Sequence, residues 1–109
     1  MGLFRRKKES DVTAENRAQI SVNARSIEAL IILARENEAF VAELRALQEK
    51  IKYLKPSAER TVISYDNKIK GLLEDLRIVL VKAEGNLPPK AESILTQIKV
   101  MVADRNAKD

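Results

Sequence analysis

Apolar residues recur along this chain at the three- and four-residue spacing of amphipathic helices, and few residues interrupt the pattern. Residues 14–54 contain neither glycine nor proline and consist mostly of good helix formers, which predicts one helix of roughly 60 Å. Pro56 ends this helix, because the residue before a proline disfavours the α conformation. A second helix is predicted over residues 57–84, closed by Gly85, and a third over residues 89–105, opened by a pair of prolines.

Each predicted helix carries a seam of apolar residues spaced alternately three and four apart. In the second helix the seam consists of Val62, Tyr65, Ile69, Leu72, Leu76, Val79 and Ala83. The first helix carries two parallel seams whose members are seven residues apart, and Leu30, Leu44 and Ile51 join them. One seam consists of Ile20, Ile27, Ala34 and Val41, and the other of Leu33, Phe40, Leu47 and Leu54. Because two seams need two neighbours and the connections are short, we predict an all-α, three-helix, up-down-up bundle, or coiled-coil hairpin, with an overlong first helix. The bundle would occupy residues 13–106 as one domain, preceded by a flexible basic arm over residues 1–12.

The lengths of the predicted helices do not match. A third helix of about 17 residues rises only about 25 Å, so it leaves both ends of the first helix without partners. The stretches 29–34 and 78–81 are also apolar around most of their circumference. Either they form the thickest part of the core, or their surplus contacts another copy or a partner protein. The second alternative gives ten candidate interaction residues, which are Ile20, Ile27, Ile31, Ile32, Leu47, Ile51, Leu54, Tyr65, Leu80 and Val81.

The positive net charge of the chain comes from its first eight residues. The formal net charge is +4, and four of the twenty basic residues stand consecutively near the start, which leaves sixteen basic and sixteen acidic residues in the remainder. Two apolar side chains followed by four cations suit contact with an anionic membrane surface. The alternative is a solvated tail. The candidate membrane or anion contacts are Leu3, Phe4, Arg5, Arg6, Lys7 and Lys8.

Over these eight residues the chain resembles the openings of some peripheral membrane-remodelling proteins of the ESCRT-III and phage-shock families. Their longer core hairpins are not reproduced in this sequence. Gly2 does not fit the myristoylation pattern, because residue 6 is arginine where serine or threonine is required. No apolar run of about 18 residues is present, and no apolar stretch of a signal peptide opens the chain. We therefore expect a cytoplasmic location, with the arm placing the protein at the inner face of a membrane.

Residue types that carry most enzyme chemistry are missing. The chain has no cysteine, histidine or tryptophan, which removes the usual nucleophile, the usual general base near neutral pH and the commonest ligands of transition metals. Glu74 and Asp75 are adjacent and point apart on a helix, so they form no catalytic dyad. We expect no enzyme activity, no cofactor, no metal site and no small-molecule substrate. The mixed charges of the first helix also make nucleic acid an unexpected partner.

Asn23 and Asn37 occupy seam positions of the first helix. A buried asparagine fixes the register of a coiled coil, whereas one at the edge of a seam contacts water. These patterns together predict a non-enzymatic assembly or adaptor protein that associates with itself through the long helix and touches a membrane by its arm. The alternative is a monomeric regulatory module that binds a helix of a partner protein.

Overall fold

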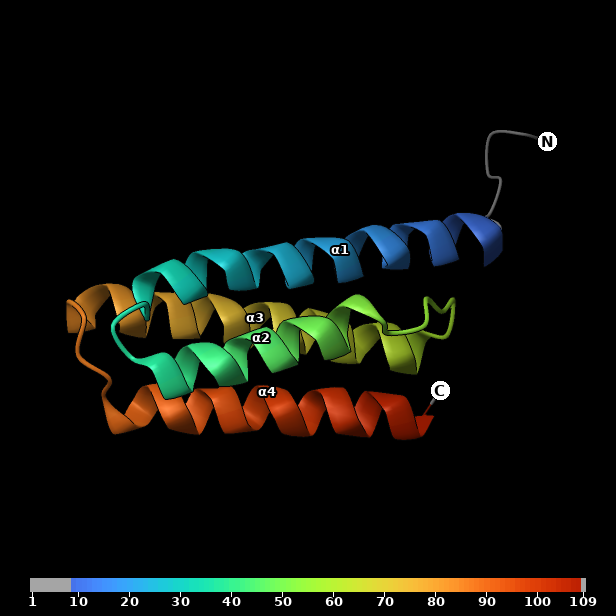
Figure 1. The fold of residues 1–109 in the computed structure, drawn as a ribbon. Coiled ribbons are helices and arrows are strands. Elements are labelled where there is room, and N and C mark those ends of the chain that lie inside the picture. Colours follow the sequence, from blue (N-terminus) through green and yellow to red (C-terminus); the bar gives the residue numbers. More distant parts are fainter. Residues whose placement is uncertain (1–8, 109) are drawn as a thin grey trace.

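The computed structural model describes residues 9–108, which form a bundle of four helices (Figure 1). Helix α1 spans Glu9–Leu33, α2 spans Glu38–Lys52, α3 spans Arg60–Ala83 and α4 spans Pro89–Lys108. The chain runs up, down, up and down, so α1 and α3 are parallel to each other and antiparallel to α2 and α4. The described residues contain no strand. The all-α prediction is therefore confirmed.

The prediction of three helices with an overlong first one is wrong, because the segment 14–54 breaks at residues 34–37. The peptide N–H of Ala34 still donates to the carbonyl of Leu30 at 2.9 Å, but the N–H of Asn37 turns back to the carbonyl of Ala34 at 2.8 Å. Helix α2 then begins with the N–H of Val41 donating to the carbonyl of Asn37 at 3.0 Å. Neither a glycine nor a proline lies at this turn. Tertiary packing has overridden local helix propensity here.

Folding back lets the two halves of the segment cover each other. Gln48 of α2 donates hydrogen bonds to the carbonyl of Ala24 at 3.0 Å and to Oε2 of Glu28 at 2.6 Å, both on α1. The two seams predicted from the sequence therefore face a common core. Helices α1 and α2, the two halves of the segment, pack against each other. The buried apolar residues of this hairpin are Ile20, Ala24, Ile27, Leu30, Ile31, Ala34, Phe40, Leu44, Leu47 and Ile51.

Several boundaries also differ from the prediction. Helix α1 begins at Glu9, so residues 9–12 form its first turn and do not belong to the arm. An acidic residue such as Asp11 suits the start of a helix, where the peptide dipoles leave a partial positive charge. Helix α3 begins only at Arg60, which leaves residues 53–59 as a loop. The candidate membrane contacts in residues 1–8 lie outside the described residues.

The seam of α3 is shifted from the predicted one. Its buried residues are Val62, Asp66, Ile69, Leu73, Leu76 and Leu80. The prediction placed Tyr65 in the seam, but Tyr65 is only half-buried and its neighbour Asp66 is fully buried. The spacing of apolar residues alone could not reveal this shift, because the observed seam contains an aspartate at a core position.

The two turns at one end of the bundle touch each other. Gly85 follows α3 with a φ of 95°, as predicted for the residue that closes this helix, and Glu84 before it has a φ of 49°. The amide of Asn37, in the α1–α2 turn, donates a hydrogen bond to the carbonyl of Gly85 at 3.1 Å. A side chain at position 85 would also bring its Cβ within 3.1 Å of Oε2 of Glu36. Glycine is favoured at this position by its φ, whereas the exposed side chain of Glu36 could move to make room for a Cβ.

Candidate docking surfaces

Most of the predicted interaction residues belong to the core of the bundle. Ile32 and Val81 are exposed, with 62% and 48% of their surface accessible, and Tyr65 is half-buried. The sequence predicted that both ends of a long first helix would lack partners, and this reason for expecting exposed apolar residues was wrong. Helix α2 covers the surface that a continuous first helix would have left exposed. The folded chain therefore does not present the other seven to a partner: Ile20, Ile27, Ile31, Leu47, Ile51, Leu54 and Leu80 are buried.

A buried ion pair lies at the end of the bundle where α1 begins. Arg105 of α4 donates from Nε to Oδ1 of Asp66 on α3 at 2.8 Å, and both side chains are fully buried. Asn16 of α1 donates from Nδ2 to Oδ2 of the same aspartate at 2.8 Å. Nη2 of Arg105 donates to the carbonyl of Lys55 at 2.9 Å and to Oδ1 of Asn16 at 3.2 Å. These groups join three helices and a loop around one carboxylate.

Three further hydrogen bonds belong to this buried polar cluster. Asn23 donates from Nδ2 to the carbonyl of Asp66 at 3.1 Å, and its own Oδ1 accepts a hydrogen bond from Gln19 at 2.8 Å. Oδ1 of Asn16 accepts a hydrogen bond from the N–H of Ser57 at 2.9 Å. Asn23 is thus buried, in agreement with the first of its two sequence interpretations. The cluster can fix the relative register of α1, α3 and α4, because any slip would leave buried charges and amides without partners.

Sequence reasoning missed Asn16, Asp66 and Arg105, although a signal was present. Asp66 continues the three- and four-residue spacing between Val62 and Ile69. Arg105 likewise follows Ile98 and Val102 at that spacing. Two opposite charges in the seams of two helices indicate a buried pair when the helices are neighbours.

A hollow of about 580 Å³ opens at the opposite end of the bundle, at the turn between α3 and α4. Its polar lining consists of Lys82, Asn86 and Lys90. Helix α3 contributes apolar residues on one side, and the turn contributes apolar residues on the other, since the chain reverses here before α4 begins. This apolar lining consists of Ile78, Val79, Ala83, Leu87 and Pro88. We call this feature the α3–α4 hollow.

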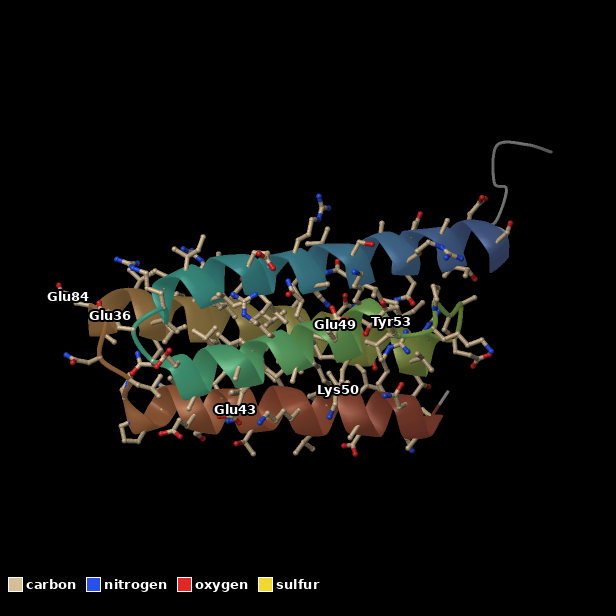
Figure 2. All side chains as sticks on the ribbon, in the orientation of Figure 1. Glu36, Glu43, Glu49, Lys50, Tyr53 and Glu84 are labelled. Carbon is tan, nitrogen blue, oxygen red and sulfur yellow. The ribbon has the colours of Figure 1, made fainter. Side chains whose placement is uncertain are left out.

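The α3–α4 hollow is accessible and carries charge of one sign. Ile78 has 47% of its surface exposed, which is high for a large aliphatic side chain. Two lysines, Lys82 and Lys90, line the hollow, and no carboxylate of the described residues does. Glu36 and Glu84 lie at the same end of the bundle (Figure 2), but neither lines the hollow. The hollow can therefore hold aliphatic groups beside negative charge.

A second depression of about 390 Å³ lies between α2 and α4. These two helices contact each other more loosely than the other neighbouring pairs. Leu47 and Val102 form its buried floor. Lys99 of α4 makes an ion pair with Glu43 of α2, and this pair links the two helices beside the depression. Because its charges are mixed and partly paired, this α2–α4 groove has less capacity to select a partner than the α3–α4 hollow.

The fold and these surfaces define an all-α four-helix bundle with a closed core and an open apolar hollow at one end. A scan against family models and searches of curated proteins and of solved structures found no match to the chain. No helix among residues 9–108 combines the length and the apolar character needed to cross a bilayer. Within the same residues, no group of three or more acidic side chains is placed to hold a metal ion.

Proposed function

We propose that the chain is a non-enzymatic docking module that binds a helix of another protein in the α3–α4 hollow. The observation that carries the proposal is an accessible hollow of about 580 Å³ that combines exposed aliphatic side chains with two lysines. Apolar hollows of this size with a few polar groups at their margin commonly serve as binding sites. Amphipathic helices bind such surfaces through aliphatic side chains three and four residues apart.

The apolar surplus predicted from the sequence supports the same location. The stretch 78–81 was expected either to form the thickest part of the core or to contact a partner, and Ile78, which lines the hollow, is about half exposed. Self-association through a long first helix loses its support, because the segment 14–54 folds back on itself. The proposal therefore follows the alternative of a module that binds a partner's helix.

Replacing Ile78 with glutamate tests the proposal, because a charge in the α3–α4 hollow would oppose burial of aliphatic groups. Val100→Glu is the matched control, since Val100 is exposed to a similar extent, 48%, and lies outside both depressions. Both variants are expected to keep the helical circular dichroism of the parent. In affinity capture with quantitative mass spectrometry, proteins held by the parent and by Val100→Glu should be lost with Ile78→Glu. Equal capture by all three chains would contradict the proposed site.

Contact with a membrane is a second candidate function for the first eight residues. Helix α1 begins at the end of the bundle opposite the α3–α4 hollow (Figure 1), so a membrane and a protein partner can be engaged together. Four consecutive cations contribute about 1 kcal/mol each near an anionic surface. We expect the full chain to sediment with vesicles containing phosphatidylserine, and a chain lacking residues 1–8 to stay in solution. Identical sedimentation of the two chains would exclude this role.

A further inference from the structure

We infer that the α3–α4 hollow selects an acidic amphipathic helix, with aliphatic side chains against Ile78 and Leu87 and carboxylates beside Lys82 and Lys90. This inference rests on the proposed function and names the chemistry of the partner. Lys82 lies in the last turn of α3, and Lys90 lies in the first turn of α4. One cation therefore lies on each of the two helices that border the hollow. The apolar lining comes from α3 and from the turn between the helices.

Both lysines are available to a partner. They are exposed, and neither makes an ion pair among the described residues. Lys99 differs from them, because Glu43 already neutralises it in the α2–α4 groove. The partial positive charge at the start of α4 is opposed by the partial negative charge at the end of α3, so the charge preference of the hollow comes from the two lysines. Glu84 and Glu92 are close in sequence, but neither lines the hollow.

A second copy of the chain is a poorer occupant than an acidic partner. The acidic start of α1, with Asp11 and Glu15, is the segment that could enter the hollow of another copy at the end of a bundle. It directly follows four cations at positions 5–8, however, and these would be brought toward Lys82 and Lys90. Like charges across an interface are unfavourable and suppress such a pairing. Charge complementarity thus favours a different, acidic chain.

The test uses two synthetic helical peptides of equal length that carry leucines at positions i, i+3, i+4 and i+7. One has glutamates flanking the leucines, and the other has lysines at the same positions. Binding to the full chain is measured by fluorescence anisotropy at two salt concentrations. We expect the glutamate peptide to bind about tenfold more tightly, because two exposed ion pairs replace two repulsions. The preference should shrink as salt is added.

Charge reversal in the hollow supplies the decisive comparison. A Lys82→Glu, Lys90→Glu variant should invert the preference between the two peptides. Lys50→Glu, Lys108→Glu is the control, because it changes the net charge equally at lysines outside the hollow. An equal effect of both double variants would overturn the inference, since the peptide would then respond only to the overall charge.

The remaining outcomes separate the inference from the proposed function. If both peptides bind equally and Ile78→Glu abolishes their binding, the acidic partner is excluded while the docking site stands. If neither peptide binds at millimolar concentration, or if Ile78→Glu changes nothing, both proposals fail. Light scattering of the chain alone measures its oligomeric state and so tests whether a second copy occupies the hollow. A dimer that Lys82→Glu, Lys90→Glu dissociates would identify a second copy and overturn the inference.

Discussion

Replacing Arg105 with alanine is expected to lower the free energy of unfolding by about 3–5 kcal/mol, because the change leaves the buried carboxylate of Asp66 without its cation. The same substitution removes the donors to Asn16 and to the carbonyl of Lys55. Both acceptors belong to the buried polar cluster or border it, so losing their hydrogen bonds to Arg105 lowers the free energy of unfolding further. Denaturation in urea, followed by circular dichroism, measures the loss. Since small domains have only about 5–15 kcal/mol of stability, this loss is a large fraction of the total.

Two control variants identify the source of this loss. Asp104→Ala removes an exposed charge next to Arg105 in sequence and should change stability by no more than about 0.5 kcal/mol. The double variant Asp66→Leu, Arg105→Met replaces both members of the pair with apolar side chains and should be more stable than Arg105→Ala alone. A double variant as unstable as the sum of its single changes would mean that the ion pair itself is not the cause.

Replacing Phe40 with alanine should destabilise the bundle by about 3–5 kcal/mol, which is the usual range for removing a buried phenylalanine. Phe40 lies in the first turn of α2 with only 2% of its surface exposed. Among the described residues it is the one aromatic side chain in the core. Tyr53→Ala is the control, because Tyr53 is 74% exposed and its loss should cost about 0.5 kcal/mol or less. Thermal and urea unfolding of the two variants give the comparison.

The effect of Phe40 depends on the α1–α2 hairpin, which a distance measurement can establish separately. Arg25 and Lys52 line one shallow hollow between α1 and α2, so their side chains are close. In an unbroken helix they would be separated by roughly 40 Å, given a rise of 1.5 Å per residue. The chain contains no cysteine, so spin labels can be placed at Arg25→Cys and Lys52→Cys alone. A long distance between these labels would contradict the hairpin and remove the reason for the expected cost at Phe40.

The sequence was sufficient for helical content, most core positions and the turn at Gly85, because these depend on local propensity and periodicity. It was insufficient for the break at residues 34–37, where every residue tolerates a helix. That break is decided by burial, since only a hairpin gives both seams of the segment a neighbour from within the chain. Asn37 was the one local hint, because asparagine favours the residue that precedes a helix.

The candidate sites were harder to predict than the fold. Asp66 was passed over because a carboxylate in a seam is unfavourable unless a cation on another helix meets it, and Arg105 is 39 residues away. The lysines of the α3–α4 hollow likewise stand among many other surface charges. Their significance depends on the absence of a carboxylate of the described residues from the lining of the hollow, which no spacing along the sequence records.

The two ends of the bundle differ in the polar interactions that join their helices and turns. At the end with the buried cluster, α1, α3, α4 and the loop of residues 53–59 share charged hydrogen bonds. At the end with the hollow, the side-chain hydrogen bond between the two turns is that of Asn37 with Gly85. Local opening follows the weakest set of interactions in a fold. The register of the bundle is therefore held chiefly at the end with the buried ion pair, whereas the end with the hollow relies on apolar packing and on the short connection between α3 and α4.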